Sequence, residues 1–127
     1  MNLHKERLIE LNRQKYYVRM GEKFMRDLPL YRSALTYYED LSGTGLPETK
    51  QRVLDGKIQR LHHTMDAADR AMGLLTPLER DILTGLFLEE DKTPLDICAD
   101  CAIEKSTLYR HRSHALEKIG KAIYGVR

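Results

Sequence analysis

Apolar residues recur at helical spacing along most of the chain, and strand-like alternation is absent. The most regular run lies between Glu48 and Leu75. There, seven apolar residues follow one another at alternating spacings of four and three: Leu54, Ile58, Leu61, Met65, Ala68, Met72 and Leu75. This heptad seam predicts a helix that packs against a partner helix. The partner is either an earlier helix of the same chain or residues 54–75 of a second copy, which would make a homodimer.

The first part of the chain predicts two further helices. Over residues 3–28 the apolar stripe is thin, with Leu8, Leu11, Val18 and Met25 as its members. Pro29 predicts a break or a kink near Leu28, because an internal proline loses a backbone hydrogen bond and clashes with the preceding turn. A second helix is expected over residues 30–41, and the glycines and proline of residues 42–47 predict a loop. So short a loop favours a helical hairpin.

The remaining residues contain two helix starts of the same kind. Thr76-Pro77 and Thr93-Pro94 are each followed by an acidic residue three positions after the threonine, a pattern that favours a capped helix N-terminus. The first helix has the apolar face Leu78, Ile82, Leu83, Leu86 and Phe87. The second is short, a turn follows at Ala102-Ile103, and a final helix is expected over residues 104–123. Its inner face is Leu108, Ala115, Leu116, Ile119 and Ile123.

These elements predict an all-α protein in two parts. Residues 1–75 would form a helical arm and a hairpin or coiled-coil segment that is suited to oligomerisation, and residues 76–127 a compact domain. The arm has a thin apolar face, so it is expected to be mobile until a partner covers it.

Charge separates the last part of the chain into two segments. Residues 76–101 hold two bases and seven acids, a net charge of −5, whereas residues 102–127 hold six bases and two acids, a net charge of +4. This layout is expected where one basic helix meets an anionic partner and its neighbours support it.

Composition narrows the class of protein. No apolar stretch is long enough to span a bilayer, two cysteines are too few for a disulfide framework, and the N-terminus lacks the apolar core of a secretory signal. We therefore expect a cytoplasmic protein with no membrane partner. Glycine-rich phosphate loops and nucleophile motifs are absent, so no enzyme is expected.

Residues 93–112, followed by residues 115–119, resemble the fourth conserved region of bacterial sigma factors, and Leu75 to Arg80 is similar to the opening of that region. The resemblance extends from about Leu75 to Ile119 and implies a helix-turn-helix whose last helix enters the DNA major groove. With no preceding sigma domains, the architecture is similar to small phage and prophage regulators of late transcription of the ArpU and RinA type.

Four residues depart from the family pattern. Cys98 replaces a small residue, Cys101 a leucine, Ala102 a glycine, and Glu104 a serine or threonine helix cap. If Ala102 is left-handed, the alanine is strained by about 1 kcal/mol.

The predicted function is a sequence-specific DNA-binding transcription regulator that reads double-stranded DNA with the helix of residues 104–123. Base contacts are expected from the outer positions near its start: Lys105, Ser106, Tyr109, Arg110 and Ser113. Phosphate contacts are expected from flanking positions: Thr93, Thr107, Arg112 and Lys118.

Two alternatives remain open at this stage. One is a sigma-like docking protein that binds RNA polymerase or another regulator without reading DNA, and the other is a phage DNA-packaging subunit. Cys98 and Cys101 with His111 and His114 superficially suggest zinc, but the spacing does not fit a finger, and both thiols should face inward. No metal or other cofactor is expected, and His111 should be a partly buried structural residue.

Overall fold

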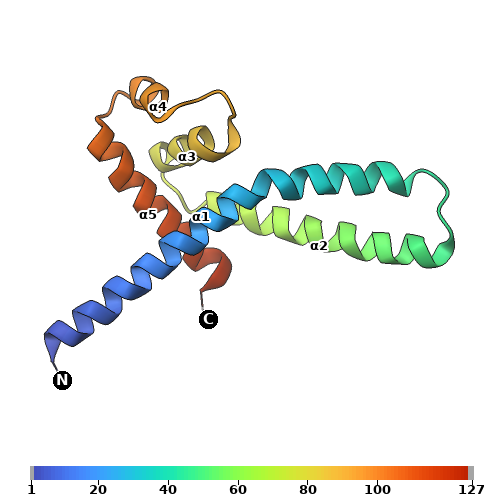
Figure 1. Ribbon diagram of the computed structural model, residues 1–127, viewed down its shortest axis with the longest axis horizontal. Helices are drawn as coiled ribbons and strands as arrows, with labels where there is room; N and C mark the ends of the chain where they lie inside the picture. The colour runs from blue at the N-terminus through green and yellow to red at the C-terminus, as the bar shows by residue number, and fades with distance from the viewer. Residues whose placement is uncertain (1, 126–127) are drawn as a thin grey trace.

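The computed structural model describes residues 2–125 and is all-α, as predicted. Arg127, one of the six bases counted above, lies outside the described residues. In Figure 1, α2 runs back alongside the second half of α1, and α5 crosses the first half of α1. The elements in chain order are α1 (Leu3–Ser42), α2 (Glu48–Met72), α3 (Pro77–Leu83), the π-helical turn η1 (Thr84–Leu88), α4 (Pro94–Cys101) and α5 (Lys105–Tyr124).

Helix α1 continues through Pro29 for 40 residues, so of the predicted break or kink the break is wrong, and residues 30–41 do not form a separate helix. Met25 and Leu28 precede the proline and are almost completely buried in the main core. Tyr31, two residues after it, packs against the same core. Packing on both sides of Pro29 therefore offsets the hydrogen bond that the proline removes.

The heptad seam of α2 faces α1 and the rest of the main core. Leu54 and Ala68, together with Leu75 just beyond the helix, are buried, whereas the other seam residues are half-buried. The seam thus finds a partner within the same chain, which was one of the two predicted possibilities.

Two apolar clusters hold the molecule together. The main core joins α1, α2, α3 and α5, and its fully buried members include Met25, Leu83, Leu116 and Ile119. A smaller cluster of Ile82, Ile97 and Leu108 joins α3, α4 and α5. The main core therefore links helices from both of the segments that the sequence separates at residue 75.

The crossing of α1 and α5 depends on two glycines. A Cβ atom at Gly21 would overlap the backbone carbonyl of Leu116, and one at Gly120 would overlap the backbone carbonyl of Tyr17. The two backbones thus approach one another more closely than any side chain would permit. This contact fixes how α5 is oriented on α1.

The predicted helix starts are confirmed. Thr76 and Thr93 each accept a hydrogen bond from the backbone N–H three residues later, and Glu79 and Asp96 accept one in return, so that each start is a complete capping box. After Leu83 the chain widens into the π-helical turn η1. The apolar residues predicted as one face divide between the two clusters, with Leu83 and Phe87 in the main core and the rest in the smaller cluster.

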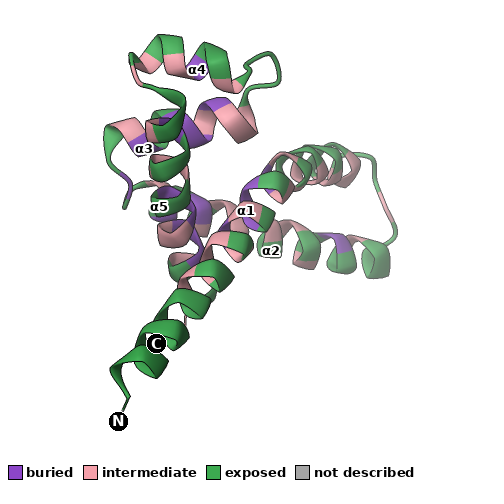
Figure 2. Cartoon of the chain, turned by 60° about the vertical axis from the view of Figure 1, so that its left-hand side comes forward, coloured by how far each residue is buried: buried purple, intermediate pink, exposed green. Residues whose placement is uncertain are grey.

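The first three turns of α1 extend beyond the body of the protein and are exposed (Figure 2). Leu3, Leu8, Ile9 and Leu11 all lie on this arm with about half or more of their surface accessible. No helix among the described residues is sufficiently long and apolar to cross a membrane.

Candidate nucleic-acid interface

Helices α4 and α5 are joined by a tight turn at Ala102 and Ile103. Ala102 is left-handed, with φ 55° and ψ 46°. Its N–H donates to the Ala99 carbonyl, and the N–H of Ile103 donates to the Cys98 carbonyl at 3.0 Å. This is a Schellman ending, which glycine adopts at lower cost than alanine. Ala102 therefore has the strained left-handed conformation that was considered from the sequence, and the turn forms in spite of that cost.

Helix α5 has one buried face and one exposed face. Leu108, Ala115, Leu116 and Ile119 are fully buried, as predicted, and Ile123 packs at the edge of the main core. The five residues predicted to contact bases all lie on the exposed side: Lys105, Ser106, Tyr109, Arg110 and Ser113. Their successive spacings of one, three, one and three keep them on one side of the helix.

The first turn of α5 leaves its backbone N–H groups open. Glu104 precedes the helix with extended backbone, but its side chain makes no capping hydrogen bond to any described residue. The groups at this end of α5 are therefore free for solvent or for an anion.

The structure brings two of the predicted phosphate-binding cations into ion pairs within the protein. The guanidinium of Arg112 donates to Glu22 Oε1 on α1 at 2.9 Å and lies over the Phe87 ring, 5.6 Å from its centroid. Both side chains of this pair are about three-quarters buried. Arg112 thus ties α5 to α1 and to η1, a role that was not predicted.

Lys118 pairs with Glu79 at 2.7 Å and connects α5 to α3. The Glu79 side chain is buried, and Lys118 is partly exposed. Burial acts to raise the pKa of Glu79, but hydrogen bonds from Lys118 and Thr76 outweigh it and hold the pKa below its ordinary value. The carboxylate stays ionised and forms an ion pair with the ammonium of Lys118.

The two predicted threonines have different surroundings. Thr93 is exposed at the start of α4, where its side chain already serves the capping box with Asp96. The backbone hydrogen bond from Thr93 lowers the pKa of Asp96. Thr107 is half-buried on α5, beside the smaller cluster residue Leu108.

The exposed face of α5 ends at a groove against α1. Ser113, Glu117 and Lys121 on α5 line this hollow of about 390 Å³, with Gln14 and Val18 opposite them on α1. Lys121 is paired with Glu117 at 3.4 Å. The first half of α1 therefore lies next to the end of the predicted base-reading surface.

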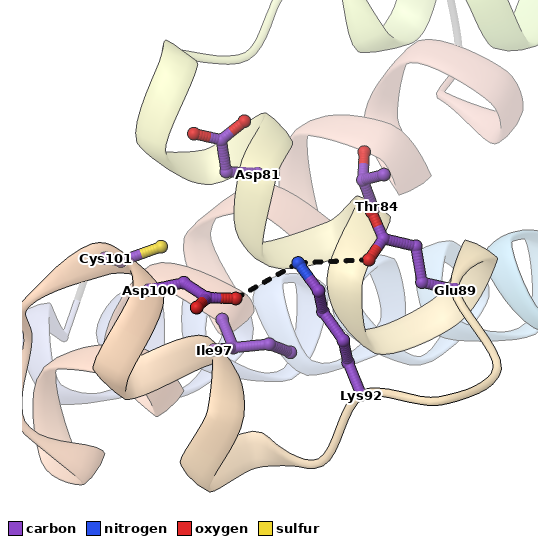
Figure 3. A pocket seen from close by; sticks show the side chains of 7 residues that line it. All are labelled: Asp81, Thr84, Glu89, Lys92, Ile97, Asp100 and Cys101. Atoms are coloured by element: carbon purple, nitrogen blue, oxygen red, sulfur yellow. Dashed lines mark ion pairs between the residues drawn. The ribbon is translucent and has the colours of Figure 1, made fainter.

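A second hollow, of about 420 Å³, lies between α3, η1 and α4 (Figure 3). Lys92 crosses it, with its ammonium 3.0 Å from Asp100 and 3.1 Å from Glu89. These two carboxylates raise the pKa of Lys92, the Asp100 bond being the stronger influence. Burial, then the Asp81 and Asp100 carboxylates, raise the pKa of the Cys101 thiol. The amine is held as a cation and the thiol as a neutral group, so neither is an activated nucleophile.

Cys98 and Cys101 are half-buried free thiols that pack against the smaller cluster. His111 is half-buried on α5, and His114 is exposed. Among residues 2–125 no group of three or more histidines, cysteines and carboxylates is arranged to hold a metal ion.

Sequence reasoning missed the partners that fix α5 in place. Glu79 was recognised as the acidic residue of a helix start but not as the partner of Lys118, and Glu22 was not recognised as the partner of Arg112. Gly21 and Gly120 were not considered, although glycine in a helix interior is a signal of close packing.

Comparison with known proteins adds no relative: no protein-family model, curated protein or solved structure matches this chain. The resemblance inferred from residues 75–119 therefore stays a prediction.

Proposed function

We propose that this protein binds double-stranded DNA in a sequence-specific manner and regulates transcription, with the outer face of α5 in the major groove. In this proposal α4, the turn at Ala102 and α5 form a helix-turn-helix of the sigma region 4 type, carried on the α1–α2 hairpin. Lys105 and Arg110 contact base edges, with Ser106, Tyr109 and Ser113 beside them.

One observation supports this proposal above the others. The five polar residues share the exposed side of α5, while the opposite side of the same helix is completely buried and held on α1 by a backbone contact. A recognition helix requires this combination, because base-reading side chains must be presented on a rigid support. The open N–H groups at the start of α5 add a site for a phosphate.

The ion pairs change the expected roles of the phosphate-contact residues. Arg112 and Lys118 have carboxylate partners that offset part of their charge, although Arg112 shares Glu22 with Arg26. We infer that Thr107 and the first turn of α5 hold phosphates more directly, with Thr93 contributing from the start of α4. Arg112 and Lys118 position the helix instead.

The experiment is selection from a pool of randomised duplexes, followed by fluorescence anisotropy on the selected duplex and on a scrambled one at several salt concentrations. Arg110→Ala and Lys105→Ala should each lower affinity for the selected duplex by about 1 to 3 kcal/mol, with a smaller loss on the scrambled one. Lys23→Ala on α1 is the matched control, because it removes an exposed charge outside α5.

Failure to enrich any duplex, with no binding at low salt, would overturn the proposal. If core RNA polymerase then retained the chain, and the α5 substitutions abolished that retention, α5 would be a protein-docking surface. A large ring-shaped assembly that binds duplexes without sequence preference would instead favour a packaging subunit.

A further inference from the structure

A groove that is both cationic and apolar lies along one side of α1 and α2, toward the loop that joins them. Two adjoining hollows of about 310 and 200 Å³ share Tyr38 and Lys57. We call their union the Tyr38 groove. Its cations are Lys50, Lys57 and Arg60, and its apolar wall includes Tyr38, Leu46 and Val53.

The chemistry of the Tyr38 groove specifies what would fit it. All three cations are exposed, and none of the described residues that line the groove is acidic. The Lys57 ammonium lies 5.6 Å from the centre of the Tyr38 ring, and Val53 is 60% exposed. A complementary surface must therefore offer carboxylates around an accessible apolar side chain.

Residues 89–104, which we call the acidic end, carry that complement. They contain six acids and one base, a net charge of −5, and the base, Lys92, is already paired with Glu89 and Asp100. Leu95 on α4 is 71% exposed within this acidic surface. Glu90 and Asp91 are exposed in the loop before α4.

The two surfaces cannot meet within one molecule. In Figure 1 the loop between α1 and α2 lies at one end of the long axis, and α4 lies toward the other. We propose that the acidic end of one copy docks into the Tyr38 groove of a second copy. Because the two contacting surfaces differ, each added copy leaves one of each free, and the association extends as a chain or closes into a ring. This inference does not depend on DNA binding.

The test is sedimentation velocity of the full chain over a range of protein concentrations at low and at high salt. The average mass should rise above that of a monomer at low salt and fall again at high salt, since the contact joins opposite charges. Lys50→Glu/Lys57→Glu should weaken self-association about tenfold or more, because it sets carboxylates against carboxylates. Lys15→Glu/Lys23→Glu, which makes the same change of charge on exposed positions of α1, should associate like the original protein.

A mixing experiment makes the test specific to this pair of surfaces. Glu90→Lys/Asp91→Lys should also weaken association by itself, whereas an equimolar mixture with Lys50→Glu/Lys57→Glu should recover it. Circular dichroism checks that each variant keeps its helices, and Lys50→Gln/Lys57→Gln should give a smaller loss in the same direction. Two outcomes would overturn the proposal: a monomer at every concentration, or an oligomer indifferent to both charge reversals.

Discussion

Helix α1 packs against two helices in two different ways. Against α2 it meets side chains, of which Leu54 and Ala68 are buried but Ile58 and Leu61 only half-buried. Against α5 it meets backbone at the two glycine contacts, and Met25 and Ile119 around them are completely buried. The first contact has room to adjust, whereas the second has none.

This difference has a physical consequence for α5, the proposed recognition helix. A seam of flexible side chains can repack when one member changes, because neighbouring residues relax into the space. A backbone-to-backbone contact can relax only if a whole helix moves. Since α5 carries the exposed polar face, a shift at the crossing would move every residue of that face together.

The largest effect should come from Gly120→Ala or Gly21→Ala. Each adds one methyl group that would overlap a backbone carbonyl, so we expect a loss of about 3 kcal/mol or more in the free energy of unfolding, at the upper end of the usual cost of overpacking. Urea unfolding followed by circular dichroism measures it. A loss within experimental error for both variants would show that the crossing is loose.

A smaller loss is expected when the link between α3 and α5 is broken. Lys118→Ala leaves the buried Glu79 carboxylate with only the Thr76 N–H as partner, which should cost about 2 kcal/mol of stability. Unfolding by urea at neutral pH measures the loss. If Lys118 instead served mainly as a phosphate contact, stability would be unchanged and the salt dependence of DNA binding would fall.

The same pair predicts an acid dependence. The folded-state pKa of Glu79 lies below its ordinary value of 4.5, so its contribution to stability is complete above that pH and is lost as the pH falls through the folded-state pKa. Glu79→Gln should remove this part of the loss of stability that occurs as the pH falls below 4.5. Equal acid sensitivity in both proteins would assign the loss to other carboxylates.

Local signals in the sequence identified much of the fold correctly. The threonine, proline and acid pattern fixed the starts of α3 and α4, and the alternating spacing of apolar residues fixed α2 and the face that it turns inward. These features depend on residues within a few positions of each other, which is the range over which capping and periodicity act. The exposure of the candidate base contacts on α5 follows from the same periodicity.

The contacts that were not predicted join residues that lie far apart in the chain. Arg112 and Glu22 are separated by 90 positions, and Lys118 and Glu79 by 39. From the sequence alone, these four charged residues look like ordinary solvated positions on helix surfaces, because each pair becomes adjacent only in the folded protein. The π-helical turn after Leu83 was missed for a related reason, because its residues Leu86 and Phe87 pack into different clusters that exist only once α1 and α4 have packed.

The rule that proline destabilises a helix interior describes the local cost of Pro29, but it does not include the tertiary packing that keeps α1 continuous. Pro29→Ala should restore a backbone donor toward the Met25 carbonyl and raise stability by about 1 to 2 kcal/mol, the helix penalty of proline less its benefit in the unfolded chain. Thermal and urea unfolding would measure the gain. A decrease in stability would mean that the half-buried ring contributes packing that outweighs the missing hydrogen bond.

The smallest predicted effect also comes from replacing a glycine with alanine, but this replacement should raise stability instead of lowering it. Gly56 lies inside α2, and a Cβ atom added there meets no neighbouring atom within 4 Å. Gly56→Ala should therefore raise stability by about 0.5 to 1 kcal/mol, because alanine favours the helix and the unfolded chain loses freedom. Gly56→Ala measures the gain in helix propensity alone, whereas Gly21→Ala and Gly120→Ala add the clash with a neighbouring helix. Comparing the three variants separates these two effects. If all three substitutions gave the same sign, the contrast between the α1–α2 pair and the α1–α5 crossing would fail, since only the space around the added methyl group distinguishes them.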